Sequence, residues 1–525
     1  MSKKEKRQFP CLPLLLCTLA AALAGTAFFR SLRAMWVFYD PFLKVIGGAT
    51  GLFLILLFNI AALLTLACAG AYSGKGIYEK KPVKIIAAVC LALTALLILG
   101  DIAIAVINGF QTNFVVLMYL KRELVFVVPF ALLVFLLIAF PITGQKSKKI
   151  IAGLTLLAVS AVMLFRVFPS SSYEITSDPC VMDTGSGYSV VFPTNAKGTA
   201  YIEYEYGGKS YKTYAQNNGR IISDRYLHSI NVPYEHLDGN SYKVGGTRVI
   251  EDFSYGSRLG KSAEKGPYEL KTPVSDTQKY LVVSDWHSYL KDAYSAISYI
   301  GDYDAVLLLG DAAAGMDFEE EAVKFIAEFG GRLTGGTMPA IYVRGNHDTR
   351  GEFASQLSAY LGYDNFDYQV SRGPYSFLVL DSGEDKEDSH VEYGGLDDYY
   401  TNRIEMIDRL ESAGRNGAKT IALTHAWQVS EPEKDLSLRA WDCFDRYGVS
   451  FVISGHMHEC RFLDGADDSE KEYLEKYPDI TAYIDGGHHG KTYIASAITL
   501  SPSGVYFEAY DNSGNKVIDE EKPWR

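Results

Sequence analysis

The chain has 525 residues, long enough for several domains that each bury a core, and it carries 50 basic and 62 acidic side chains for a net charge of −12. The first third is basic and the remainder is acidic, which argues against a protein that coats nucleic acid. Its seven cysteines are an odd number, which does not predict a disulfide framework. The cysteines outside the apolar runs also lack the Cys-x-x-Cys spacing of a metal site.

Apolar runs dominate the first 168 residues, at 11–29, 45–72, 85–107, 124–140 and 150–168. Each is near the ~20 residues needed to cross a hydrocarbon core. Lysine and arginine cluster before the first run, between the second and third, and before the fifth, so the positive-inside bias puts everything after Phe168 outside the cytoplasm. We therefore expect residues 1–168 to form a transmembrane region of about five helices. The protein would be a multi-pass protein of the cell membrane, with the lipid bilayer as a partner.

Three alternatives stay open in this region. The first run is also compatible with a cleaved signal sequence ending near Ala22-Leu23-Ala24, which would leave four spans. The apolar stretch Asn113–Leu120 is interpreted as interfacial, but as a sixth crossing it would place the rest of the chain in the cytoplasm. Asp101 is either a functional charge inside the third span or a residue near the outer headgroups, and we favour the headgroup position.

The next section, residues 170–273, is rich in short alternating runs such as Tyr188–Phe192 and Ala200–Tyr206. Turn clusters such as Gly207-Gly208 separate these runs, and the pattern predicts an all-β sandwich of about 100 residues. From residue 279 to 525, strands alternate with helical stretches, which predicts βαβ units and an α/β domain. The expected fold is thus multi-domain: an α-helical transmembrane bundle, an all-β sandwich and an α/β domain.

Polar residues follow five predicted strands of the α/β section, at the points where the strands end. Ligands of open α/β sheets bind at the carboxyl ends of the strands, so we expect these residues to converge. Carboxylate and imidazole together suit Mn²⁺, Fe and Zn²⁺, and two ions ~3.5–4 Å apart can act on a phosphoester. The sequence therefore predicts a two-metal site for Mn, Fe or Zn, built from two Asp, one Asn and four His: Asp285, His287, Asp311, Asn346, His425, His456 and His458.

The order of these blocks, D-x-H, G-D, G-N-H-D, H and G-H-x-H, resembles the calcineurin-like metallophosphoesterase superfamily from Lys279 to about Tyr510. The resemblance implies a four-layer αββα domain at 279–525. It also implies that one metal binds Asp285, His287 and His458, that a second binds Asn346, His425 and His456, and that Asp311 bridges both.

The same resemblance implies catalytic roles for three further residues. His347 would contact the phosphoryl group and protonate the leaving oxygen, while a metal-bridging hydroxide attacks phosphorus. Asp348 matches the acidic residue that orients this histidine. Arg344 matches an arginine with which some members hold phosphate.

The β-rich section resembles the fibronectin-III-like domain that precedes the purple acid phosphatase fold. The chain departs from that family, because Ala314 stands where those enzymes have a tyrosine ligand and because they lack a histidine at the place of His287. We therefore favour a Mn, Fe or Zn site in a membrane-anchored member of bacterial type. Trp286 and Trp427 are interpreted as either packing beneath the metals or stacking on substrate, and His488 and His489 as either lining the pocket or forming a turn.

The sequence thus predicts a membrane-anchored phosphoesterase that hydrolyses phosphomonoesters or phosphodiesters, with its catalytic domain outside the cytoplasm. Small molecules, lipids and envelope polymers all stay open as substrates. The alternative function is a non-catalytic membrane sensor or transport-linked protein that uses the phosphoesterase fold to bind ligand. An intact ligand set together with His347 favours the enzyme.

Overall fold

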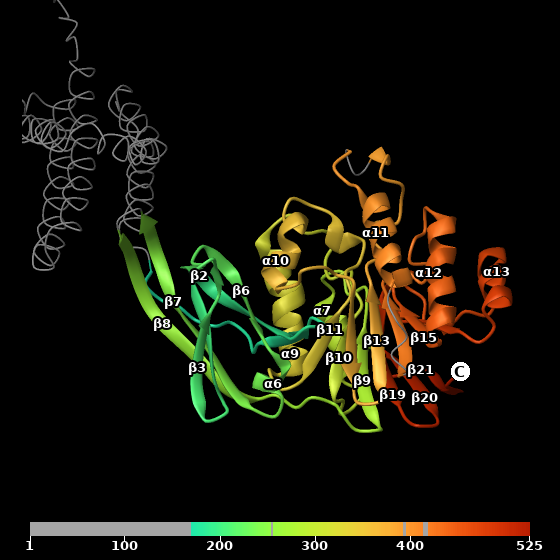
Figure 1. Ribbon diagram of the computed structural model, residues 1–525, viewed down its shortest axis with the longest axis horizontal. Coiled ribbons are helices and arrows are strands. Elements are labelled where there is room, and N and C mark those ends of the chain that lie inside the picture. The colour runs from blue at the N-terminus through green and yellow to red at the C-terminus, as the bar shows by residue number, and fades with distance from the viewer. Residues whose placement is uncertain (1–169, 254–255, 392–394, 413–417) are drawn as a thin grey trace, which may run out of the picture. The chain divides into compact units, whose positions relative to one another are not determined.

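The computed structural model describes residues 170–253, 256–391, 395–412 and 418–525, which are mostly α/β and β-sheet (Figure 1). No helix in these ranges is long and apolar enough to cross a membrane. The longest of them, α11 (Tyr399–Ser412) and α12 (Lys434–Tyr447), have 14 residues each, fewer than the ~20 that a span needs. The five predicted spans, and the alternatives weighed with them, lie outside the described residues.

These findings correct two predictions. The fold class is wrong in that the described residues contain no helical transmembrane bundle, and among them no helix supports a multi-pass location in the membrane with a bilayer as partner.

The larger of two main sheets has 13 strands and a parallel centre. Strands β9 (Gln278–Val283), β10 (Ala305–Leu308) and β11 (Pro339–Tyr342) pair in parallel and are largely buried, as expected for strands covered on both faces. Beyond β9, three antiparallel strands extend the sheet to one edge: β19 (Thr492–Leu500), β20 (Gly504–Asp511) and β21 (Lys516–Pro523). The short strand β18 (Gly487–His489) also pairs with β19.

The β-rich section continues the same sheet on the other side. β1 (Cys180–Asp183) pairs in parallel with β11, and the 19-residue β2 (Tyr188–Tyr206) then pairs with four strands of the section. A separate two-sheet sandwich is therefore not confirmed. The other strands are β3 (Lys209–Tyr214), β6 (Arg225–Val232), β7 (Ser241–Phe253) and β8 (Gly256–Glu269), with a small hairpin of β4 (Gln216–Asn217) and β5 (Arg220–Ile221).

The smaller main sheet has six strands in the order β12-β13-β14-β15-β17-β16. Four of them pair in parallel, and an antiparallel strand lies at each edge. The strands are β12 (Tyr368–Arg372), β13 (Tyr375–Leu380), β14 (Lys419–Thr424), β15 (Val449–Ser454), β16 (Arg461–Phe462) and β17 (Thr481–Ile484).

An apolar core that includes Val282, Leu307, Ile421 and Ile453 contains side chains from both sheets. Helices cover the outer faces (Figure 1): α7 (Leu290–Ile297), the π-helix η2 (Ala322–Glu328), α9 (Phe329–Thr334) and α10 (Leu357–Leu361) beside the larger sheet, and α11, α12 and α13 (Asp468–Lys476) beside the smaller. In α12 the apolar residues recur at helical spacing on the buried face, and the helix ends at the left-handed Gly448. The short helices are α6 (Tyr234–Leu237), α8 (Glu319–Glu321), η3 (His347–Thr349) and η4 (Ala354–Gln356).

Candidate metal centre

Strands of both sheets end at one place. The predicted ligands follow β9, β10 and β11 of the larger sheet and β14 and β15 of the smaller one within a few residues. Several of them adopt left-handed backbone conformations with φ from 36° to 71°, which is uncommon outside glycine and clusters at functional sites: Asp285, His287, Asp311, His456 and His458.

Glycines in these loops let the carboxylates approach the neighbouring backbone. A Cβ at Gly345 would lie 2.2 Å from Asp311 Oδ1, and a Cβ at Gly455 would lie 2.5 Å from Asp285 Oδ2. Since no real Cβ tolerates such contacts with a fixed carboxylate, these two positions require glycine. Gly310 itself has a φ of 87° in the turn that presents Asp311.

Asp285, His287 and His458 form one ligand group, with donor atoms all within 4.8 Å of one another. Asp285 Oδ1 lies 3.9 Å from His287 Nε2 and 3.8 Å from His458 Nε2. The Asp285 side chain is fully buried, whereas a third of the His458 side chain is exposed. The group is therefore open to solvent on the His458 side.

Asp311, His425 and His456 form a second group within the same distance of one another. Asp311 Oδ2 lies 3.3 Å from His425 Nε2 and 3.5 Å from His287 Nε2, so this carboxylate stands between the two groups. The side-chain oxygen of Asn346 lies 3.2 Å from His456 Nδ1. All seven residues predicted as ligands thus meet in one place.

Neighbouring oxygens fix the histidine tautomers. His425 Nδ1 lies 2.6 Å from the Leu309 carbonyl and His287 Nδ1 lies 3.3 Å from the Ala313 carbonyl. A carbonyl only accepts hydrogen bonds, so each Nδ1 carries a hydrogen and each neutral ring presents its Nε2 lone pair to the carboxylates. Glu431 Oε1, 3.2 Å from His456 Nε2, likewise leaves the lone pair of that ring on Nδ1.

With these rings in their neutral form, the centre gathers hydrogen-bond acceptors that face one another. The Asn346 oxygen lies 3.1 Å from His425 Nε2 and 3.3 Å from Asp311 Oδ2, and turning the amide over would relieve this one conflict. It would not relieve Asp285 Oδ1 or His287 Nε2, which are buried without a hydrogen-bond partner. A cation is the group that satisfies all these lone pairs at once, and imidazole with carboxylate suits Mn, Fe or Zn.

The electrostatics also favour positive charge at this place. Burial by itself would lower the pKa of His425, yet the carboxylates of Asp311 and Asp285 raise it to about 10. Burial would raise the pKa of Asp311, but His425 and the neighbouring imidazoles hold it below its usual range. The pKa of His287 is instead lowered, chiefly by burial. Of the two imidazoles, His425 lies slightly closer to the shared carboxylate, at 3.3 Å against 3.5 Å.

His347 lies beside this shared carboxylate. Its backbone N–H donates to Asp311 Oδ1 at 2.8 Å, and its Nδ1 lies 2.9 Å from the Ala314 carbonyl. Its ring packs edge-on against His287 with centroids 4.8 Å apart. The Ala314 carbonyl fixes the hydrogen on Nδ1, which leaves Nε2 as the variable position of the ring.

Asp348 is placed differently from the prediction that it orients His347. Its carboxylate accepts hydrogen bonds from the backbone N–H groups of Asp311, Ala312 and Gly345 and from the Tyr342 hydroxyl, all at 2.9–3.0 Å. Burial and the nearby Asp311 raise the pKa of Asp348 to about 6. This residue therefore holds the loop that carries the shared carboxylate.

Arg344, predicted to hold phosphate, is committed elsewhere. Its guanidinium forms a two-pronged ion pair with Asp381, at the end of β13, and packs against the rings of Phe366 and Tyr399. Only 13% of its side chain is exposed. The structure therefore gives Arg344 a place in the packing between the sheets and not a contact with the ligand groups.

The sequence interpretation missed two charged residues at the site. Arg350 lies on the far side of Asn346 and His347, where Glu384 and Asp385 hold it. Glu431 contacts His456 as described above. Arg350 stands only three residues after His347, which was a usable signal, but no pattern marks Glu431 as a neighbour of the site.

Three residues near the ligands whose roles the sequence left open can now be placed. Trp286 and Trp427 are buried in apolar clusters, so they pack inside the protein. The rings of His488 and Tyr289 stack 3.6 Å apart, and the His488 N–H donates to the Asp285 carbonyl at 3.1 Å. His488 thus lies next to the first ligand group.

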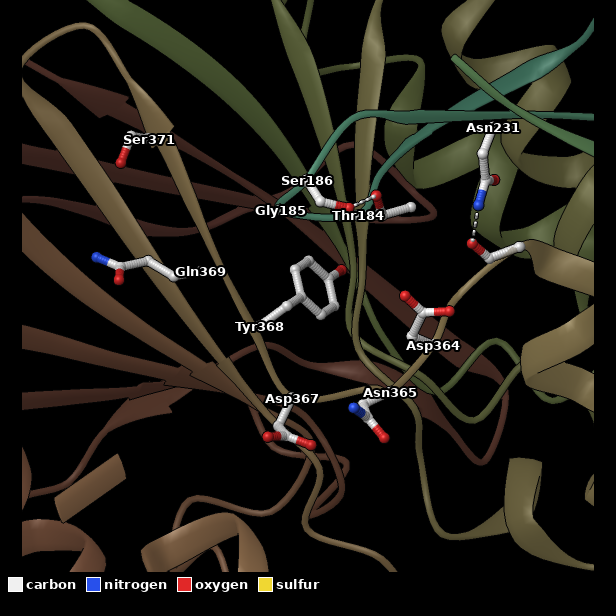
Figure 2. A pocket seen from close by; sticks show the side chains of 11 residues that line it. Thr184, Gly185, Ser186, Asn231, Asp364, Asn365, Asp367, Tyr368, Gln369 and Ser371 are labelled. Atoms are coloured by element: carbon white, nitrogen blue, oxygen red, sulfur yellow. Dashed lines mark hydrogen bonds between the residues drawn. The ribbon is translucent and has the colours of Figure 1, made fainter. Parts of the chain in front are cut away.

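A separate cavity of about 540 Å³ opens between the β1–β2 turn and β12 (Figure 2). Its lining is polar and includes the Tyr368 ring, the Asn365 amide and the carboxylates of Asp364 and Asp367. Arg409 holds Asp367 through two hydrogen bonds of 3.0 and 2.9 Å. None of the predicted ligands or catalytic residues lines this cavity, so it is not the metal centre.

A family model and several solved structures are similar to this chain. Residues 278–460 match the family described as calcineurin-like phosphoesterase. No curated protein matches the chain significantly.

Similar solved structures include PhoD, with a TM-score of 0.40 and 12% identity over 66% of this chain and 94% of that one. GAP50, the anchor in the inner membrane complex of Plasmodium, has a TM-score of 0.33 and 11% identity over 48% and 90%. A metallophosphoesterase from Sphaerobacter thermophilus has a TM-score of 0.23 and 13% identity over 47% and 89%.

The matched segment runs from β9 to just beyond the His456-Met457-His458 loop and contains every residue of both ligand groups. The matched family is one that typically binds divalent metals, which agrees with the carboxylates and imidazoles of the two groups. Within this chain, residues 278–460 are therefore similar to the calcineurin-like phosphoesterase family.

Proposed function

We propose that the protein is a metal-dependent phosphoesterase that hydrolyses phosphomonoester or phosphodiester bonds at a dinuclear centre within residues 279–525. The observation that carries the proposal is the position of Asp311 between the two ligand groups. In addition, two atoms of the first group, Asp285 Oδ1 and His287 Nε2, are buried without a hydrogen-bond partner. In the same proposal, residues 170–273 form a β-rich domain that adjoins the catalytic one.

The residues divide between two cations of Mn, Fe or Zn. Asp285, His287 and His458 would hold one, and Asn346, His425 and His456 would hold the other, with Asp311 shared by both. When bound, such a pair of ions would neutralise phosphoryl charge and activate water for in-line displacement. Glu431 would act through His456, because a carboxylate on the remote ring nitrogen fixes the tautomer and the ring orientation.

The side chains around the cations bind and orient the ester. In this proposal Asn346 turns its oxygen toward the second cation and donates from its NH₂ to a phosphoryl oxygen. His347, with Nδ1 held by Ala314, hydrogen-bonds the leaving oxygen through Nε2 and delivers a proton there. Asp348 is a positioning residue that fixes the backbone on which Asp311 stands.

The test compares full-length wild type with Asp311→Asn and His347→Ala, assaying bis(p-nitrophenyl) phosphate and p-nitrophenyl phosphate with added Mn²⁺. Arg409→Lys, which alters an ion pair to Asp367 outside the ligand groups, is the matched control. We expect turnover by wild type and control, and loss of at least about 100-fold in both site variants, as for a general acid contributing 10²–10⁴-fold. A folded wild type that binds Mn²⁺ and phosphate but hydrolyses neither ester would contradict the proposal and favour a non-catalytic sensor.

A further inference from the structure

Two aromatic rings lie beside the first ligand group, near its open His458 side. The rings of Tyr289 and His488 stack with centroids 3.6 Å apart and planes only 3° from parallel. Tyr289 follows His287 by two residues, and two residues of chain span at most about 7 Å. The pKa of His488 is lowered by burial and by His458, so its ring lies within electrostatic reach of that ligand. The pair thus adjoins two of the residues proposed to bind the first cation.

Both rings are fixed to the loop that carries Asp285. The His488 N–H donates to the Asp285 carbonyl at 3.1 Å. The Tyr289 N–H donates to the Trp286 carbonyl at 2.5 Å. A Cβ at Gly487 would lie 2.5 Å from the Asp285 Cβ, so β18 lies directly against this loop. Two segments far apart in sequence are therefore anchored on the same ligand loop, which fixes where their rings stand.

The Tyr289 ring is accessible although one of its faces is covered. His488 covers that face, yet 49% of Tyr289 is exposed. Met457, next to His458, is 39% exposed as well, so solvent reaches this side of the centre over several residues. Single exposed aromatic residues are common on protein surfaces, but this one is stacked, anchored and next to the proposed ligands. Its outer face is free to stack on a second planar ring.

The alcohol part of an ester would extend toward this pair. In the proposed function His347 delivers a proton to the leaving oxygen, and its ring packs against His287 with centroids 4.8 Å apart. The His287 ring in turn stacks against His458 at 5.1 Å. The leaving alcohol therefore lies on the side of the first ligand group, where Tyr289 stands. Its remote atoms do not react, but contacts to them can select the substrate.

The chemistry of the pair suits a planar ring better than an aliphatic chain. A phenol and an imidazole offer π faces, and a base that stacks on an aromatic side chain gains about tenfold in affinity. An aliphatic chain has no π face to contribute.

We propose that Tyr289 and His488 form a stacking platform for a planar ring in the alcohol part of the substrate, so that nucleotides and similar ring-bearing phosphoesters are the substrate class. Tyr289 contacts the ring, and His488 is the positioning residue that supports Tyr289 from behind. The inference rests on the proposed function and deepens it, because it narrows the range of substrates.

The experiment compares two ligands that differ only in a base, by calorimetry on Mn²⁺-loaded full-length protein. One is an adenosine phosphonate with carbon in place of the 5′ ester oxygen, which cannot be hydrolysed as an ester. The other is the same phosphonate without adenine. The ratio of the two affinities isolates the contribution of the ring, whatever the phosphonate group gains from the cations.

The variants separate the ring from its support. Tyr289→Leu removes the aromatic face, Tyr289→Phe keeps it, and His488→Leu keeps the backbone hydrogen bond but removes the supporting ring. Tyr299→Leu is the matched control. Tyr299 lies beyond the other end of α7, is 47% exposed and also stacks on an aromatic ring, that of Tyr510.

We expect wild type, Tyr289→Phe and Tyr299→Leu to prefer the adenine-bearing phosphonate by about tenfold or more, and Tyr289→Leu by less than about threefold. The preference should also decline in His488→Leu. No adenine preference in the wild type, or an unchanged preference in folded Tyr289→Leu or His488→Leu, would overturn the proposal. An equal loss of affinity for both phosphonates in Tyr289→Leu would overturn it too, since Tyr289 would then only support the ligand loop. A wild type that binds neither phosphonate has the same consequence.

Failure of the proposed function gives a different pattern. A wild type that prefers the adenine-bearing phosphonate but hydrolyses neither the p-nitrophenyl esters nor adenosine 5′-monophosphate would end the enzyme proposal. The affinity ratios of the Tyr289 variants would still decide whether this ring contacts the base.

Discussion

Replacing Asp311 by Asn tests the shared carboxylate most sharply, because it preserves the shape and removes one charge from both ligand groups. Asp311 Oδ2 lies 3.3 Å from His425 Nε2 and 3.5 Å from His287 Nε2. At an effective dielectric constant of about 20, two unit charges 3.3 Å apart interact by about 5 kcal/mol. The attraction between this carboxylate and a divalent cation would be at least as large. We therefore expect Mn²⁺ affinity to fall by more than about 100-fold, which exceeds the roughly 10–100-fold loss typical of removing a residue that only hydrogen-bonds to a metal ligand.

The variant has a second consequence in metal-free protein. Because the Asp311 carboxylate is the largest influence that raises the pKa of His425, this pKa should fall well below about 10 in Asp311→Asn. Calorimetric titration with Mn²⁺ measures the first effect, and NMR of ¹⁵N-labelled histidine across the pH range measures the second. A folded Asp311→Asn protein that binds Mn²⁺ as wild type does, with the pKa of His425 unmoved, would refute the reasoning.

Three further predictions follow from single contacts. Glu431→Gln should weaken Mn²⁺ binding about tenfold without unfolding the protein, by loosening His456, and calorimetry checks this. Gly345→Ala should destabilise the fold by about 1–3 kcal/mol in chemical unfolding, because its Cβ would meet Asp311 Oδ1 at 2.2 Å; unchanged stability would show that the loop can shift freely. Burial raises the pKa of Asp485 to about 7, above its value in the unfolded chain. Its contribution to the free energy of unfolding is therefore complete below about pH 4 and is lost as the pH rises through 7. Asp485→Asn should remove that loss, and urea unfolding at pH 5 and pH 8 measures it.

The meeting of the seven predicted ligands could be predicted because each of them lies next to a strand in the sequence. An apolar run followed by Asp285, Asp311 or His425 indicates a strand end, and strand ends of parallel sheets converge for reasons of topology alone. Local order along the chain was therefore enough to bring the seven residues together. The glycines at 345 and 455 belong to the same local pattern, since they allow the carboxylates to approach.

The surroundings of the site depend on tertiary contacts that no local pattern encodes. Arg344 has the expected place in its motif, but Asp381 reaches it from the residue just after β13 of the other sheet. Glu384 reaches Arg350 from a loop 34 residues further along the chain. Asp348 lies next to His347 in sequence, yet its carboxylate turns to the backbone of the Asp311 loop.

In the fold as a whole, too, local patterns predict some features and distant contacts decide others. Alternating residues such as those of Tyr188–Phe192 correctly indicate strands. They do not reveal that β1 pairs in parallel with β11, through Val181 opposite Pro339, and so joins the β-rich section to the larger sheet. Periodicity specifies that a strand forms and which face is buried, whereas its partner is chosen by contacts distant in sequence.

The most direct test of the dinuclear centre is anomalous diffraction from crystals of the full-length protein, collected above and below the absorption edges of Mn, Fe and Zn. The account predicts two anomalous peaks per chain, one beside His287 and His458, one beside His425 and His456, with Asp311 contacting both. A single peak remote from Asp311, or no peak in protein saturated with each of these metals, would contradict it.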